Sequence, residues 1–269
     1  MMKKPTPRPV TARRWTSLLL ATTALSAGIS EARTLPPVIA QDQSLWLAQA
    51  EGGEGGEAGA VAGVAPDTAY LVRLAIVEGH LIAAGSLYEK GLVDEAIGLS
   101  YHPEAEMMDE VRASLAAHGQ GDFTPAMQVF SAAMESGAPV PAMYEALAAF
   151  QDDVEAAINA AGPDAKARFA VAIAVLKAAA AEYAGSIEGN EVTDALAYHE
   201  AQAFVDVARE MIAVLTEAPK LGPVAARAIA AMEPAAEAFG AVDGVFAAND
   251  PAILLAVAAR VELISSQLR

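Results

Sequence analysis

The 269-residue sequence is 54% hydrophobic, enough apolar content for a buried core, and carries a formal charge of −17 at pH 7. Six of its 17 Lys and Arg residues lie within the first 33 positions, so the rest of the chain is more acidic still. A surface of this charge repels phosphate groups, which excludes nucleic acid as a partner. The absence of cysteine excludes disulfides, zinc–thiolate sites, iron–sulfur clusters and covalent c-type haem attachment.

The N-terminus has the pattern of an export signal. Residues 1–14 carry basic side chains and no acid, and an apolar run rich in Leu and Ala follows over residues 15–29. The run is shorter than the roughly 20 residues that span a bilayer, and Ser30-Glu31-Ala32 offers a small-x-small cleavage site. We therefore expect a signal peptide over residues 1–32, a periplasmic location, and no membrane span in the mature form.

Composition divides the remainder into a linker and a helical domain. Residues 33–65 include the Gly/Glu/Ala stretch from Glu51 to Val64, which has no apolar periodicity and predicts a flexible, solvated tether. Abundant Ala and few aromatics over residues 66–269 favour closely packed helices. Gly162-Pro163 marks a possible boundary within this domain, near residue 162.

Proline, glycine and apolar spacing predict about eight helices joined by short turns. The fold class is therefore all-α, an antiparallel helical bundle with the option of two four-helix halves. The expected helices cover about residues 67–90, 103–118, 124–135, 141–161, 164–187, 191–217, 223–239 with a break near Pro234, and 251–269.

Histidines carry most of the chemical interest, because imidazole binds transition metals and titrates near neutral pH. His80 lies in the middle of a helix between Gly79 and Gly85, and glycines there indicate close approach of another helix or of a ligand. His102 and Glu106 are four residues apart, which places both on one helix face. His199 lies in the long helix over 191–217. A metal site made from His80, His102, Glu106 and His199 is geometrically conceivable in a bundle core.

Other classes of site find less support in the sequence. The nine methionines are dispersed at helical spacings, which is typical of core filler, although thioethers also bind copper(I). The sequence contains no HExxH, GxSxG or nucleotide-binding glycine loop, so we do not expect an enzyme.

The segments Gly79-His80-Leu81 with Gly85, and His102-Pro103 followed by Glu106, resemble a group of uncharacterised exported helical proteins of Gram-negative bacteria. A looser resemblance is to imelysin-like periplasmic proteins, helical bundles linked to iron uptake that carry a Gly-x-His-x-x-Glu motif. Here Gly79 and His80 are adjacent, and Ala83 stands at the position of the glutamate. The resemblance implies a periplasmic bundle with a role in iron handling.

Two functions remain open at this stage. The first is a non-enzymatic periplasmic binding protein that holds a transition-metal ion (iron or copper) or haem at a histidine-containing site between helices. The second is a helical module that binds a periplasmic protein without a cofactor, with Gly79, Ala83, Ala84 and Gly85 forming a seam where helices cross. Convergence of His80 with His102 or His199 favours the first.

Overall fold

The computed structural model describes residues 54–242 and 246–268. The predicted signal peptide (1–32) and the predicted linker as far as residue 53 lie outside these ranges. The described elements are α2 (Glu54–Val61), α3 (Pro66–Glu89), α4 (Val93–Ser100), α5 (His102–Glu106), α6 (Met108–Ala117), α7 (Thr124–Glu135), α8 (Val140–Ala161), α9 (Ala165–Gly185), β1 (Ile187–Glu188), β2 (Glu191–Val192), α10 (Ala195–Ala213), α11 (Gly222–Met232), the 3-10 helix η1 (Glu233–Glu237) and α12 (Ala252–Ser265).

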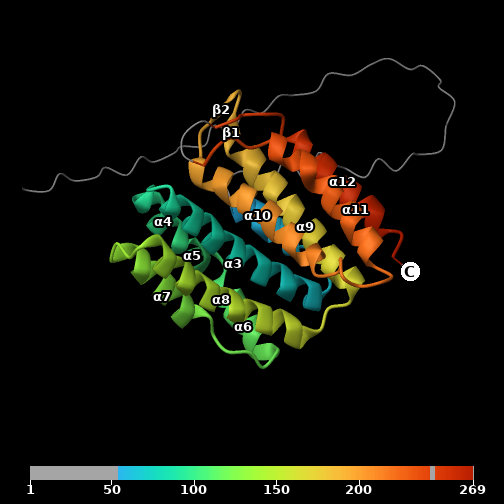
Figure 1. Cartoon of the computed structure of the whole chain (residues 1–269), viewed down its shortest axis with the longest axis horizontal. Helices are drawn as coiled ribbons and strands as arrows, with labels where there is room; N and C mark the ends of the chain where they lie inside the picture. The colour runs from blue at the N-terminus through green and yellow to red at the C-terminus, as the bar shows by residue number, and fades with distance from the viewer. Residues whose placement is uncertain (1–53, 243–245, 269) are drawn as a thin grey trace, which may run out of the picture. The chain divides into compact units, whose positions relative to one another are not determined.

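The fold is an all-α bundle, as predicted. Over the described ranges, α3 packs with α4 and α8, and α7 packs with α4 and α8, which gives one group of four helices. A second group follows in the sequence, in which α9 packs with α10 and α12, and α11 packs with α10 and α12. Helix α3 joins the groups because it also packs against α9 and α10, and Figure 1 shows it between α8 and the α9–α10 pair.

Helix α3 is the core helix of the bundle. Its buried positions include Leu71, Leu74, Leu81 and Leu87 and lie on every side of the helix, because neighbours cover it from several directions. Among the residues described, it is the one helix long and apolar enough to cross a membrane. Most of that apolar stretch is buried inside the bundle, which is also the composition that a core helix needs.

The structure divides one of the expected helices and delays the start of another. Residues 103–118 form α5 and α6, separated by Met107, whose φ of −143° is not helical. Residues 187–192 form a small antiparallel hairpin that turns at Gly189, where φ is +65°. Helix α10 therefore begins only after Asp194, whose carboxylate accepts hydrogen bonds from two backbone amides. The break predicted near Pro234 is present as the change from α11 to η1.

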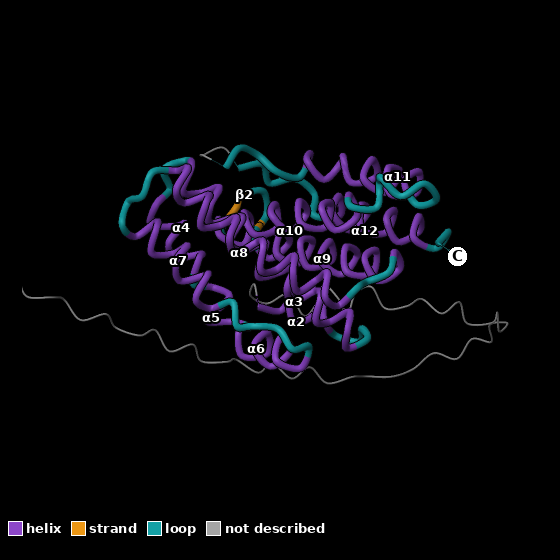
Figure 2. Tube along the Cα trace, turned by 60° about the horizontal axis from the view of Figure 1, so that its bottom comes forward, coloured by secondary structure: helices purple, strands orange, loops and turns teal. Residues whose placement is uncertain are grey.

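Helix α2 differs from the sequence prediction, since residues 54–61 were expected to belong to the solvated linker. Its three glycines give it low helical propensity. Packing supplies the missing stability, because α2 lies against α9 and α3 and buries Glu57 and Ala60. Figure 2 shows α2 next to α3. Residues 54–61, whose composition is typical of a linker, therefore form a helix that places the carboxylate of Glu57 in the core.

Close packing explains the glycine at position 79. A Cβ on Gly79 would overlap the ring of Phe204 on α10, and a Cβ on Gly85 would lie 3.3 Å from Leu147 on α8. The small-residue seam predicted in α3 is therefore occupied by helices of the same chain.

Gly79→Ala is expected to lower the free energy of unfolding by about 1–3 kcal/mol, because the Phe204 ring must move. Chemical denaturation measures the change. Gly98→Ala in α4 is the matched control, since nothing lies within 4 Å of its added Cβ. This variant should raise the free energy of unfolding by up to about 1 kcal/mol, because alanine has the higher helix propensity. Equal stabilisation of the two variants would contradict the packing argument.

Candidate metal centre

His80 is buried in the core, and its two ring nitrogens have different surroundings. Its side chain is 0% exposed, and its Nδ1 lies 2.9 Å from the carbonyl oxygen of Ile76, one turn earlier in α3. A carbonyl oxygen can only accept a hydrogen bond, so Nδ1 of His80 carries a proton and donates it to Ile76. Nε2 is the second nitrogen of the ring. The ring of Phe204 packs edge-to-face against His80 at 5.4 Å. Nε2 is the ring nitrogen that a cation could bind once it carries no proton.

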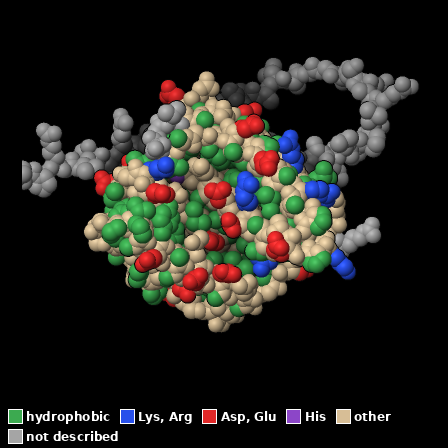
Figure 3. Space-filling view, in the orientation of Figure 1, with side chains coloured by type: hydrophobic (Ala, Val, Ile, Leu, Met, Phe, Trp, Pro, Cys, Tyr) green, Lys and Arg blue, Asp and Glu red, His purple; other side chains and the backbone are tan. Residues whose placement is uncertain are grey.

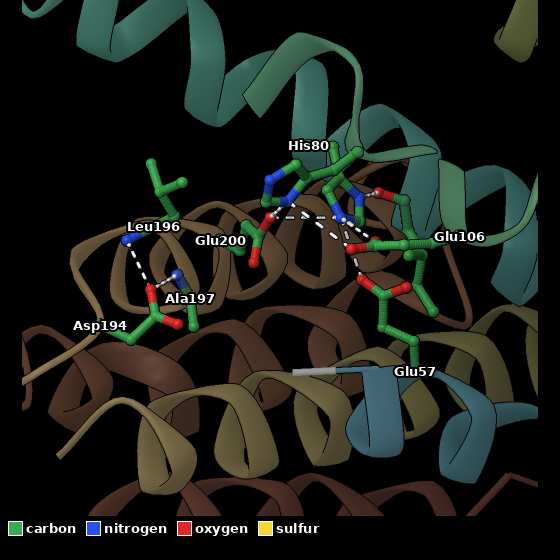
Figure 4. A network of polar contacts seen from close by, with 9 residues as sticks. Glu57, His80, Glu106, Asp194, Leu196, Ala197 and Glu200 are labelled. Atoms are coloured by element: carbon green, nitrogen blue, oxygen red, sulfur yellow. Dashed lines mark hydrogen bonds and ion pairs between the residues drawn. The ribbon is translucent and has the colours of Figure 1, made fainter. Parts of the chain in front are cut away.

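Three carboxylates surround Nε2 of His80. Its distance is 3.0 Å to Oε1 of Glu57, 3.3 Å to Oε1 of Glu200 and 3.5 Å to Oε2 of Glu106. The three glutamates come from α2, α10 and α5, so separate parts of the chain meet here, as Figure 4 shows. Glu57 and Glu200 are buried and Glu106 is partly exposed.

His102 stands on the outer side of the same carboxylates. Its Nδ1 lies 2.8 Å from Oε1 of Glu200 and 3.7 Å from Oε1 of Glu106. The rings of His80 and His102 are 6.2 Å apart. His102 begins α5 and Glu106 ends it, so the four-residue spacing places both side chains on one face of this short helix. Two imidazoles therefore face a shared set of carboxylate oxygens.

The distances match the spacing of ligands around one metal ion. Bonds of about 2.0–2.2 Å place neighbouring ligand atoms about 3.0 Å apart in octahedral geometry and about 3.4 Å apart in tetrahedral geometry. Two overlapping triads have ligating atoms within 4.8 Å of one another: His80, His102 and Glu200, and Glu57, His80 and Glu106. Side chains from four helices thus lie at distances that could hold one metal ion.

Protons compensate the negative charge of the cluster. Burial lowers the pKa of His80, but Glu57, Glu106 and Glu200 outweigh it and raise this pKa well above its usual 6.5. The hydrogen bond to Glu200 raises the pKa of His102 against the effect of burial. The pKa of Glu57 is raised because its burial outweighs the charge of His80. A metal ion that binds these two imidazoles would have to displace any protons on the nitrogens that bind it.

A cavity of about 340 Å³ lies against the cluster. Glu57 and Glu106 form part of its wall, together with Arg73 and Glu110. The acidic character of this wall favours entry of cations. A metal ion bound by Glu57 and Glu106 would thus have an open side toward the cavity, where water or a further ligand can bind.

Glu182 is a third buried carboxylate, after Glu57 and Glu200. It lies on α9, which packs against α2, α3 and α10, the helices of Glu57, His80 and Glu200. Its side chain is 2% exposed, and neither oxygen has a hydrogen-bond partner. Burial first, and then the charges of Glu57 and Glu200, raise its pKa to about 9. Glu182 is therefore a neutral acid at pH 7 in the metal-free protein.

Glu182→Gln is expected to stabilise the metal-free protein increasingly as pH rises. The folded pKa is about 9 and the ordinary value is 4.5, so above pH 4.5 folding requires uptake of a proton. The wild type then loses up to about 1.4 kcal/mol per pH unit relative to the variant. Urea denaturation at about pH 6 and about pH 8, with a chelator present, measures this difference. A parallel pH dependence of the two proteins would contradict the assignment.

The structure brings together His80, His102 and Glu106 of the predicted metal set, but not His199. The His199 ring packs against Tyr198 and Phe246, and its buried Nδ1 has no partner. It belongs to neither triad.

Glu57, Glu182 and Glu200 were not predicted to belong to the site. Glu57 lies in a segment that reads as linker, and Glu182 lies in an alanine-rich helix without any motif. Glu200 is the direct neighbour of His199, which was singled out in its place. Only the pairing of helices in space shows that these three glutamates belong near the cluster.

Comparison with known families bears on the second half of the chain. Residues 159–267 match the iron permease-associated 4-helix bundle domain. This segment runs from the end of α8 through α12 and includes Glu182 and Glu200. Glu57, His80, His102 and Glu106 precede it. The match supports a helical-bundle family for this half. No curated protein and no solved structure matched the sequence.

Proposed function

We propose that this protein is an exported, non-enzymatic binding protein that holds an iron ion at the cluster around His80. The observation that carries the proposal is the convergence of three carboxylates on the buried Nε2 of His80, at 3.0–3.5 Å. Burying this many ionisable groups costs free energy unless a cation or protons compensate them. A bound metal ion compensates them directly.

The chemistry of the donors supports iron over copper(I). Imidazole nitrogen and carboxylate oxygen are the ligands at this site, and both suit iron, whereas copper(I) prefers thioethers. Met107 lines the adjacent cavity but belongs to neither triad. The match of residues 159–267 to a domain described as iron permease-associated points in the same direction.

The geometry does not favour haem as the ligand. The iron of a haem would lie about 2 Å from Nε2 of His80, on the side where the oxygens of Glu57, Glu106 and Glu200 stand. A porphyrin in that position would overlap all three carboxylates. A single ion fits between them without such a clash.

The N-terminal pattern supports a periplasmic location. Basic residues 1–14, the apolar run to residue 29 and the small-residue site at Ala32 form the export signal. Fractionation of cells that express the full chain should place the protein in the periplasm, shortened to begin at Arg33. Retention of the complete chain in the membrane fraction would contradict cleavage.

Calorimetric titration of the chelator-treated, tag-free mature protein with Fe2+ under anaerobic conditions tests the binding function. We expect saturable binding and a rise in melting temperature, because a ligand that binds only the folded state stabilises it. Competition by Zn2+ and Cu2+ ranks the metals. A protein that binds none of these ions would contradict the proposal and return attention to binding of a periplasmic protein.

A further inference from the structure

The cavity beside the cluster has the size and position of a small-molecule site. Its volume of about 340 Å³ lies at the lower end of the range for such sites, about 300–1,000 Å³. Glu57 and Glu106 line it, so an ion that these carboxylates hold with His80 would lie at its edge. The other charged residues of the wall are Arg73 and Glu110, and the rest of the lining is apolar. A ligand in this space could therefore contact the ion at one end and the wall at the other.

Arg73 is the basic group of this wall. It is half-buried, and within the described ranges it forms no ion pair, unlike Arg112 and Lys177. Arg73 precedes His80 by seven residues on α3, so both side chains leave the same face of the helix, about 10.5 Å apart along its axis. A guanidinium group donates two parallel hydrogen bonds to a carboxylate. Arg73 is thus placed to bind the far end of an acid whose near end binds the ion.

The glutamates of the wall determine when an anion can enter. In the metal-free protein, Glu57, Glu106 and Glu110 repel a carboxylate. An ion bound at His80 compensates the charges of Glu57 and Glu106, and Glu110 is exposed, so solvent screens its charge. We therefore expect the anion to bind only with the ion, and each of the two must then raise the affinity of the protein for the other.

We propose that the cavity binds a small organic dicarboxylate together with the iron ion, with one carboxylate on the ion and the other on Arg73. This inference rests on the proposed function, because the ion forms one end of the anion site. The cargo of the protein is then a complex of iron with an acid. The second carboxylate of the acid is what the cavity recognises.

The test is anaerobic calorimetric titration of the Fe2+-loaded, tag-free mature protein with malate and with lactate. Both acids offer the ion one carboxylate and a neighbouring hydroxyl, but only malate has a second carboxylate for Arg73. We expect the wild type to bind malate about 10-fold to about 100-fold more tightly than lactate, the effect of a hydrogen-bonded charge pair. In Arg73→Gln the two affinities should agree within about 3-fold. The metal-free protein should bind neither acid.

Arg209→Gln is the matched control and should keep the preference for malate. Arg209 is likewise half-buried, but it lies on α10 and does not line the cavity. Circular dichroism verifies that each variant is folded, and iron analysis after each titration verifies that the ion remains bound. The comparison of malate with lactate in the wild type needs no variant.

The outcomes separate the anion site from the function on which it depends. A wild type that binds no Fe2+ overturns both. A wild type that holds Fe2+ but binds neither acid, binds both equally or loses its iron to malate overturns only the anion site. A preference for malate that persists in Arg73→Gln overturns the assignment of Arg73 as the partner of the second carboxylate.

Discussion

His80→Ala is expected to lower the affinity for Fe2+ by more than about 100-fold, because changes outside the ligand shell already cost 10–100-fold. The variant removes the imidazole nitrogen shared by both triads. It also leaves Glu57, Glu106 and Glu200 without the charge that they face, so the metal-free variant should melt at a lower temperature. Anaerobic calorimetry measures the affinity and differential scanning calorimetry the stability.

His199→Ala is the matched control for this experiment. His199 is a buried histidine of α10, directly beside Glu200, but its ring packs against Tyr198 and Phe246. Truncation should therefore reduce stability through lost packing and change the affinity for Fe2+ by less than about 3-fold, well below the effect of a lost metal partner. Equal losses of affinity in the two variants would show that the triads do not define the site.

Metal affinity is expected to rise steeply with pH. The pKa values of His80 and His102 are both raised above 6.5 by the surrounding glutamates, so both imidazoles are protonated below that pH. Each proton that the ion displaces gives about a tenfold gain in affinity per pH unit. Two protons predict up to about a 100-fold gain between about pH 5.5 and about pH 6.5.

The sign of this pH dependence follows from linkage. A group whose pKa is raised in the metal-free folded protein holds its proton more tightly, and the ion must compete with that proton. Above the raised pKa values the competition ends and the affinity becomes constant. Titrations in two buffers of different ionisation enthalpy count the released protons. An affinity that does not change over the acidic range would contradict displacement of the imidazole protons.

Much of the fold was predictable, because helix boundaries depend on local chemistry. Pro66 at the start of α3, Asp164 at the cap of α9 and the break at Pro234 all act through neighbouring backbone groups. The division at Met107 was not predictable, because α5 and α6 end and begin there without a proline or glycine. Docking of α2 was missed for a related reason, since its helix depends on packing and not on propensity.

The candidate site was only partly predictable. His102 and Glu106 share one short helix, so spacing alone relates them. Their meeting with His80, Glu57 and Glu200 depends on how four helices pack, and no local pattern encodes it. His199 was predicted to be a metal ligand, but the next residue of the same helix, Glu200, faces the cluster instead. The sequence alone did not distinguish these two neighbouring residues. The resemblance to imelysin-like proteins stays a prediction.

The acidic composition of the whole chain does not by itself indicate that the protein binds metal ions. On the face drawn in Figure 3, Asp and Glu side chains are dispersed among apolar and basic ones. The distinctive acidic groups are the few that the fold has buried around His80.

Helix α2 has a consequence for how long an ion stays bound. Glu57 comes from a helix of eight residues with three glycines, so this helix depends on its packing against α9 and α3 to stay formed. Undocking of α2 removes one ligand and uncovers the others, whereas His80 and Glu200 are fixed on long helices. We expect the residence time of the ion to follow the lifetime of this one short helix in its docked position. Replacing glycines of α2, which are not ligands, should therefore slow or speed release of the ion.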